Sequence, residues 1–222
     1  MESLDAAGYA LLVADGIPIK EMREGVKVWR LPDGRMVKLF RPRGLLSRSR
    51  LQPANRRFAR NAAMLSRLGF VTVTVQQLFY NQENGCFGVV YAELPGRTLE
   101  QAFAESPSPA LIESLAQLLV DLHQHGVLFR SLHLGNVVWL DSGLLGLIDV
   151  EELNVSGRAL GVRSRVRNFR HLLRRELDRN LLTVEGFQSL ASGYLSHCGL
   201  SARRNQQLSR WLEKLSDEVD WP

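Results

Sequence analysis

The chain has 222 residues, of which 45% are hydrophobic and 23% are charged. This balance is typical of a folded protein and excludes a disordered or fibrous one. The length suffices for one large domain or two small lobes. The net charge of +5 and the pI of about 9.6 favour anionic ligands, but they do not separate nucleic acid, acidic lipids, phosphorylated sugars and nucleotides.

The two cysteines, Cys86 and Cys198, lie far apart and lack metal-ligand spacing, so we expect neither a disulfide framework nor a zinc site. The first residues include Glu2 and Asp5, where a signal peptide carries positive charge. No apolar run reaches the ~18 residues that span a bilayer. We therefore expect a cytoplasmic protein, and a peripheral contact with the inner membrane stays open.

Residues 1–95 read as a small antiparallel sheet with one helix. The runs VKVWRL and RMVKLF, joined by an Asp-Gly pair, predict a β-hairpin. A helix ending at Gly69 is predicted by apolar residues at helical spacing, namely Phe58, Ala62, Leu65 and Leu68. Strand-like runs return at FVTVTVQQL and CFGVVYAEL, with the turn-rich NQENG between them.

Residues 96–222 read as mainly helical. Apolar residues between Leu111 and Leu122 form one helical stripe, and further helices are predicted around 164–178, 183–197 and 201–216. A short hairpin, VVWLDSGLLGLIDV, interrupts them. The predicted class is therefore α+β, with a strand-rich lobe at 1–95 and a helical lobe at 96–222.

Lys38 is the first candidate for a binding role. It lies in a strand-like run whose two faces both look buried. An ammonium group among apolar neighbours is costly unless an anion meets it, which favours binding. The alternative is a lysine near a strand end whose ammonium group reaches water.

Asn136 and Asp149 are the candidates for a metal site. Asn136 ends the stretch LFRSLHLGN, and Asp149 follows in LIDV after the short hairpin. An amide oxygen and a carboxylate are hard ligands, suited to a Mg²⁺ ion that carries nucleotide phosphates. Taken singly, such residues more commonly cap a turn or end a strand.

These motifs occur together in a known pattern. FRSLHLGN aligns without gaps with the kinase loop HRDLxxxN, and more closely with the form HGDLHxGN, in which His133, Gly135 and Asn136 match. LIDV stands where kinases have DFG, and MVKLF where they have VAIK. Between residues 25 and 175 the chain resembles the bacterial lipopolysaccharide-core kinases, which include the Kdo and heptose kinases and short relatives labelled toluene tolerance proteins.

The resemblance implies a bilobal protein-kinase-like fold and an ATP-dependent phosphotransferase, with ATP and Mg²⁺ as cofactors and a lipopolysaccharide-core sugar or related envelope molecule as acceptor. It implies that Lys38 contacts the α and β phosphates and that Asn136 and Asp149 hold Mg²⁺. It also implies that the segment of Glu93 and Leu94 receives the adenine. Gly25 stands where the phosphate cover is expected, without the full GxGxxG pattern.

Two departures from the pattern bear on activity. Ser131 stands at the position of the catalytic aspartate, and Asn61, in a helix without acids, stands where a glutamate usually pairs with the lysine. General-base help is worth roughly 10²- to 10⁴-fold, so its loss predicts a slow enzyme or one that uses another base. His133 is the nearest substitute, although HGDLHxGN also has this histidine.

A pseudokinase, which binds nucleotide or regulates a partner without transfer, is therefore the alternative function. Catalytic roles are considered for Ser131, His133 and Asp149 under the enzyme hypothesis. Retained Asn136 and Asp149 argue against the pseudokinase, because a protein without Mg²⁺ has no need of both ligands.

Basic residues also form a pattern on one predicted helix. Arginines at helical spacing share one face, namely Arg163, Arg167, Arg170 and Arg174, and a second group, Arg41, Arg43, Arg48 and Arg50, would extend it. A solvated surface is the usual meaning of such a face. The sharper hypothesis is a dock for an anionic sugar or lipopolysaccharide-core acceptor, because guanidinium groups bind such anions bidentately. Nucleic-acid binding is not expected, since no recognised motif appears.

Overall fold

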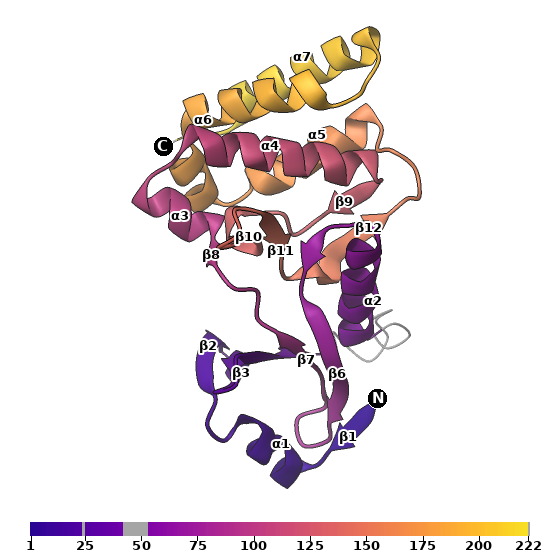
Figure 1. Ribbon diagram of the computed structural model, residues 1–222, viewed down its shortest axis with the longest axis vertical. Helices are drawn as coiled ribbons and strands as arrows, with labels where there is room; N and C mark the ends of the chain where they lie inside the picture. Colours follow the sequence, from indigo (N-terminus) through magenta and orange to yellow (C-terminus); the bar gives the residue numbers. More distant parts are fainter. Residues whose placement is uncertain (24, 42–52, 222) are drawn as a thin grey trace. The chain divides into compact units, whose positions relative to one another are not determined.

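The computed structural model describes residues 1–23, 25–41 and 53–221, which form a mixed α/β protein (Figure 1). The chain divides into two compact units, Met1–Leu94 and Pro95–Pro222. Arg43, Arg48 and Arg50 lie outside the described residues. Among the described helices, none combines the length and apolar character that crossing a membrane requires.

A six-stranded sheet dominates the described part of unit 1, with the strand order β1-β6-β7-β4-β3-β2. Its strands are β1 (Glu2–Leu4), β2 (Ile17–Met22), β3 (Gly25–Arg30), β4 (Arg35–Phe40), β6 (Thr74–Asn81) and β7 (Cys86–Ala92). The predicted hairpin is confirmed as β3 and β4. Its turn contains Gly34 at φ 79°, in the left-handed region that glycine tolerates best.

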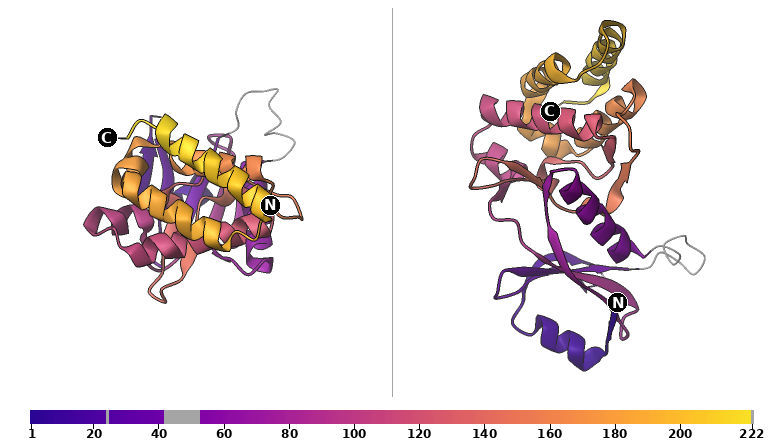
Figure 2. Two further views of the ribbon diagram at one scale, coloured as in Figure 1. Left: turned by 90° about the horizontal axis from the view of Figure 1, so that it is seen from above. Right: turned by 45° about the vertical axis from the view of Figure 1, so that its right-hand side comes forward.

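The two faces of this sheet are covered by different helices, α1 (Ala6–Val13) and α2 (Ala54–Arg67) (Figure 2). On one face, Val37 and Leu39 belong to a buried cluster that includes Val13 of α1. The strand alternates, so Phe40 points to the other face, where its ring centroid lies 5.9 Å from that of Phe58 in α2. Lys38 shares this second face with Phe40.

The expectation of an antiparallel sheet with one helix was wrong in two respects. The helix α1 was missed, and the edge strand β1 runs parallel to β6. A three-residue strand carries no alternation signal, and α1 is apolar on all sides, so it lacks an amphipathic stripe. The available signal was Asp5, whose carboxylate caps α1 by accepting a 2.8 Å hydrogen bond from the backbone N–H of Gly8.

Unit 2 is mainly helical. Its described helices are α3 (Leu99–Glu105), α4 (Pro109–Gln124), α5 (Val162–Leu172), α6 (Glu176–His197) and α7 (Ala202–Glu218). The predicted stripe from Leu111 to Leu122 is confirmed as the buried side of α4. Helices α6 and α7 pack side by side (Figure 2). The division of the next helices differs from the expected one, because α5 ends at Leu172 and α6 continues through a kink at Thr183, where φ is 58°.

Short strands and 3-10 turns connect these helices. They are β8 (Arg97–Thr98), β9 (Val127–Phe129), η1 (Leu134–Asn136), β10 (Val137–Trp139), β11 (Leu145–Leu147), η2 (Val150–Glu152) and β12 (Leu153–Val155). The predicted short hairpin is confirmed as β10 and β11, in which Val137 pairs with Leu147. Strand β9 pairs with β12 and leads directly into the segment that contains Ser131.

A buried network of polar side chains is hydrogen-bonded to β9. We call it the sealed network, and it comprises His123, Arg165, Asn168 and Tyr194. Arg165 is 1% exposed and donates hydrogen bonds to the carbonyls of Leu160 (2.8 Å) and Cys198 (2.9 Å) and to the hydroxyl of Tyr194 (2.7 Å). His123 Nε2 faces the side-chain oxygen of Asn168, so this nitrogen carries the ring proton and Nδ1 accepts from the Tyr194 hydroxyl, which is 2.7 Å away.

Asn168 connects this network to the strand. His123 Nε2 is 3.1 Å from Asn168 Oδ1, and this oxygen also accepts a 3.2 Å hydrogen bond from the backbone N–H of Phe129. The Asn168 amide nitrogen donates to the Phe129 carbonyl at 2.8 Å. Burial lowers the pKa of His123 to about 3, so the imidazole is neutral at pH 7. The network therefore fixes the end of β9 without an ion pair.

Candidate functional site

The segment from Arg130 to Asn136, which we call the loop, is tied to its surroundings through its backbone. The N–H of Arg130 donates to the carbonyl of Glu152 at 2.8 Å. The N–H of Leu134 donates to Asp178 Oδ1 of α6 at 3.0 Å. The carbonyl of His133 accepts from the N–H of Asn136 at 2.9 Å. These bonds satisfy backbone groups that would otherwise be costly to bury.

Ser131, Asn136 and Asp149 come together within unit 2. The side-chain nitrogen of Asn136 donates to the Ser131 carbonyl at 2.8 Å. The Ser131 hydroxyl donates to the Asp149 carbonyl at 3.2 Å. The N–H of Ile148 donates to the Asn136 carbonyl at 3.0 Å, which closes the β10–β11 hairpin. The hairpin thus brings two residues thirteen positions apart to the same place.

The side chains of Asn136 and Asp149 suit a hard cation. Asn136 is 5% exposed, and because its amide nitrogen is used by Ser131, its amide oxygen is the group that can meet a metal ion. Asp149 is half-buried, which gives its carboxylate partial access to solvent. Amide and carboxylate oxygens are the ligands that Mg²⁺ takes in proteins. The chemistry of this donor set therefore fits Mg²⁺.

The backbone of Asp149 is unusual, with φ 54° and ψ 43°. This left-handed conformation is uncommon outside glycine, although aspartate and asparagine tolerate it better than most residues. Residues held in such conformations cluster at functional sites. It also turns the chain sharply from β11 into η2, which places the Asp149 carbonyl against Ser131.

Ser131 supplies a hydroxyl where the kinase pattern has a carboxylate. Its proton is directed to a backbone carbonyl, and a serine hydroxyl does not act as a base at neutral pH unless another group activates it. The three residues can therefore bind and orient a metal-bound anion. They do not form a base and nucleophile pair.

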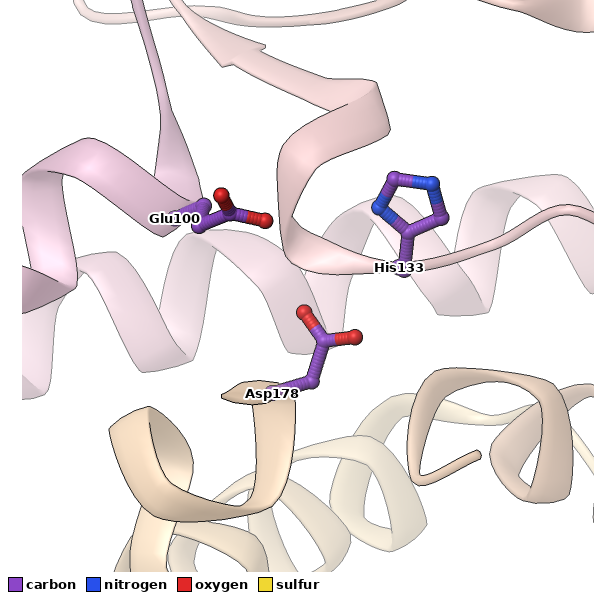
Figure 3. Close-up of side chains that lie close together, drawn as sticks. All are labelled: Glu100, His133 and Asp178. Atoms are coloured by element: carbon purple, nitrogen blue, oxygen red, sulfur yellow. The ribbon is translucent and has the colours of Figure 1, made fainter. Parts of the chain in front are cut away.

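The imidazole of His133 belongs to a second group, which we call the loop cluster and which comprises Glu100, His133, Arg175 and Asp178. Figure 3 shows Glu100 of α3 and Asp178 of α6 pointing toward His133. A ligand-type atom from each of these three residues lies within 4.8 Å of the others. The Arg175 guanidinium occupies their neighbourhood, with Nη1 at 2.8 Å from both Glu100 Oε2 and His133 Nδ1.

The loop cluster is an ion-paired anchor for the loop. Arg175 Nε lies 3.5 Å from Asp178 Oδ2, so the chain supplies its own cation where a metal ion would otherwise fit. Burial raises the pKa of Asp178 to about 6, and nearby Arg175 opposes this rise. Sequence reasoning missed Glu100, Arg175 and Asp178. The only local signal was that acids in first helical turns, such as Glu100 and Asp178, are favourable.

Lys38 is described within unit 1. It is 4% exposed, so almost all of the residue is buried. Lys38 Nζ lies 5.3 Å from the ring centroid of Phe40 and 5.6 Å from that of Phe58, within the range of cation–π attraction. Asn61, at the position of the usual glutamate, is buried on α2.

The remaining predicted nucleotide contacts also lie in unit 1. Gly25 begins β3 at φ 111°, a conformation that favours glycine. Glu93 forms an ion pair with Arg30, and its N–H donates to the Gly34 carbonyl at 3.3 Å. Leu94 is half-buried and ends the unit.

The predicted arginine face is confirmed as the exposed side of α5 and the residues after it. Arg163, Arg167, Arg170 and Arg174 are exposed and line one groove. On the opposite side of α5, Phe169 and Leu172 are fully buried. Sequence reasoning missed the other wall of the groove, which contains Trp211 of α7.

Comparison with known proteins adds no family: no family model matches the chain, and no curated protein matches it. The loop, its hydrogen bonds and the residues that surround it therefore provide the basis for assigning a function.

Proposed function

We propose that the protein is an ATP-dependent phosphotransferase of protein-kinase-like fold, which acts in the cytoplasm on a lipopolysaccharide-core sugar or a related envelope molecule. The observation that carries the proposal is the joining of Ser131, Asn136 and Asp149 by direct hydrogen bonds. This arrangement supports a Mg²⁺-nucleotide site, because Ser131 links an asparagine and an aspartate that stand at the two ends of one hairpin, and both residue types offer hard oxygen ligands.

Each residue has a distinct role under this proposal. Asn136 and Asp149 hold Mg²⁺, which when bound neutralises charge on the phosphates. The buried ammonium group of Lys38 contacts the α and β phosphates, Gly25 lies at the phosphate cover, and Glu93 with Leu94 receives the adenine. A lysine buried among aromatic rings is a suitable partner for an anion, since desolvation strengthens its attraction.

The transfer step balances without a carboxylate at position 131. The acceptor hydroxyl oxygen bonds to the γ-phosphorus while the bond to the β–γ bridging oxygen breaks. ADP leaves, and the acceptor proton passes to the transferred phosphoryl group or to water. Most of the rate in such reactions comes from positioning and charge neutralisation, so Ser131 is compatible with slow turnover.

A pseudokinase is the second candidate, and the contacts of Ser131 favour it. Its hydroxyl donates a hydrogen bond to the backbone carbonyl of Asp149 and is not paired with a general base. Asn61 in place of the usual glutamate points the same way. Under this alternative the protein binds Mg-ATP and transfers nothing.

Calorimetric titration with Mg-ATP and a parallel assay of ADP release test both candidates. We expect Asp149→Asn and Lys38→Ala each to abolish turnover, while Asp141→Asn, an exposed aspartate in the turn of the same hairpin, retains it. Asn is chosen at position 149 because it tolerates the left-handed backbone. Binding without turnover in the unmodified protein would support the pseudokinase. Unchanged turnover in both site variants would refute the site.

A further inference from the structure

A groove runs along α5 and α7 in unit 2, and its chemistry differs from that of the loop. Its volume is about 730 Å³, within the range of small-molecule pockets. Its lining is composed of the four arginines of the predicted face together with Val166, His171 and Trp211. Among the residues that the structure describes, no acidic one lines it.

The positive charge of the groove is largely uncompensated. Within the described part of the chain, no carboxylate forms an ion pair with Arg163, Arg167 or Arg174, and Arg170 meets Glu218 only at 3.8 Å. Burial, with the charges of Arg167 and other nearby arginines, lowers the pKa of His171, so the guanidinium groups alone supply the charge at neutral pH. Several unpaired guanidinium groups in one concavity concentrate anions.

The opposite wall contains Trp211 of α7, and Lys214 Nζ lies 5.9 Å from the centroid of its ring. The Trp211 side chain is 38% exposed, and Val166 adds apolar surface beside the arginines. An indole face provides a platform against which a ring packs, while guanidinium forks take phosphate oxygens bidentately. One phosphate group engages one or two forks, so four arginines indicate a ligand with more than one phosphate.

We propose that this groove binds a phosphorylated sugar, a small molecule with two or more phosphate groups on one ring. A nucleic-acid strand suits the site less well, because it needs a track of successive charged and stacking contacts, and the groove offers a single indole. Binding in this groove does not require phosphoryl transfer. It is expected for an enzyme and for a pseudokinase alike.

Tryptophan fluorescence of the full chain, titrated with fructose bisphosphate in the absence of nucleotide, tests the proposal. We expect a saturable signal change that Trp211→Phe removes. The double variant Arg163→Gln/Arg167→Gln should bind at least about tenfold more weakly, since hydrogen bonds to charged groups contribute that much or more. Arg203→Gln changes an exposed arginine near the N-terminus of α7 that does not line the groove, so it is the matched control and should bind normally.

Titrations with other ligands distinguish between ligand classes. Fructose should not bind, and inorganic phosphate should bind much more weakly than the bisphosphate. Absence of bisphosphate binding, equal weakening by Arg203→Gln, or phosphate binding as tight as that of the bisphosphate would overturn the proposal. Tighter binding of a short oligothymidylate would also overturn it, in favour of nucleic acid. Thermal unfolding of each variant checks that these exposed substitutions leave the fold intact.

Discussion

Two polar networks in unit 2 hold the loop, and they are built on opposite principles. The sealed network of His123, Arg165, Asn168 and Tyr194 contains no carboxylate and satisfies its one charge with carbonyls and a hydroxyl. The loop cluster is half-exposed at Glu100 and Arg175 and contains two carboxylates. The first fixes β9 before the loop, and the second fixes Leu134 inside it.

The difference teaches how each network responds to pH. Burial lowers the pKa of His123 in the folded state, whereas it raises the pKa of Asp178. Protonation therefore works against the fold at His123 and in favour of the fold at Asp178. A lower pH is therefore expected to weaken the attachment of β9 by the sealed network and to strengthen the attachment of Leu134 by Asp178.

The largest expected effect concerns His123. Its folded pKa of about 3 lies below the unfolded value of 6.5, so its contribution is present above pH 6.5 and is lost as the pH falls toward 3. This loss is on the order of 4 kcal/mol of unfolding free energy. Urea unfolding across this range should show a smaller acid loss in His123→Gln than in the unmodified protein. Parallel pH profiles would contradict the assignment.

Removal of the buried charge of Arg165 should have the second largest effect on stability. Arg165→Ala deletes hydrogen bonds to two carbonyls and the Tyr194 hydroxyl and leaves a cavity, so we expect a loss of about 3 kcal/mol at pH 7. Arg165→Met fills much of the space without a buried charge and should lose less. Exposed Arg210→Ala on α7 is the control. A loss below about 1 kcal/mol in Arg165→Ala would mean that water replaces the guanidinium at little cost.

The smallest of the three effects concerns Asp178 and has the opposite sign. Its folded pKa of about 6 exceeds the unfolded value of 3.8, so its stabilisation is complete below pH 3.8 and is lost as the pH rises through 6. The loss is on the order of 2 kcal/mol. Asp178→Asn keeps an acceptor for the Leu134 N–H and cannot lose a proton. The variant should therefore gain on the unmodified protein from pH 4 to pH 7, and a constant difference would refute the proposed burial effect.

Regular spacing explains which parts of the fold were predictable. The β3–β4 hairpin follows from two strand-like runs around Asp33 and Gly34, and the buried side of α4 follows from its leucine stripe. Helix α1 escaped because a short helix that is apolar all round has no stripe to detect.

The candidate site divides in the same way. Asn136 and Asp149 were predicted to form one metal site, and the short hairpin between them brings the two residues together. The loop cluster was not predicted, because Glu100 and Arg175 are 75 positions apart and no spacing rule relates them. The same holds for Trp211, which reaches the arginine groove from a separate helix. Contacts between distant elements depend on packing, which a single sequence does not reveal.

The kink at Thr183 separates two parts of α6 that support the loop in different ways. The turn before it carries Asp178, which anchors the loop, and the turns after it carry Tyr194, which belongs to the sealed network. Thr183 restarts the helix by accepting a 3.3 Å hydrogen bond from the Gly186 N–H. The kinked helix α6 therefore supports both ends of the loop, and the angle of the kink sets the distance between Asp178 and Tyr194. A substitution that straightened α6 would displace Asp178 and Tyr194 together.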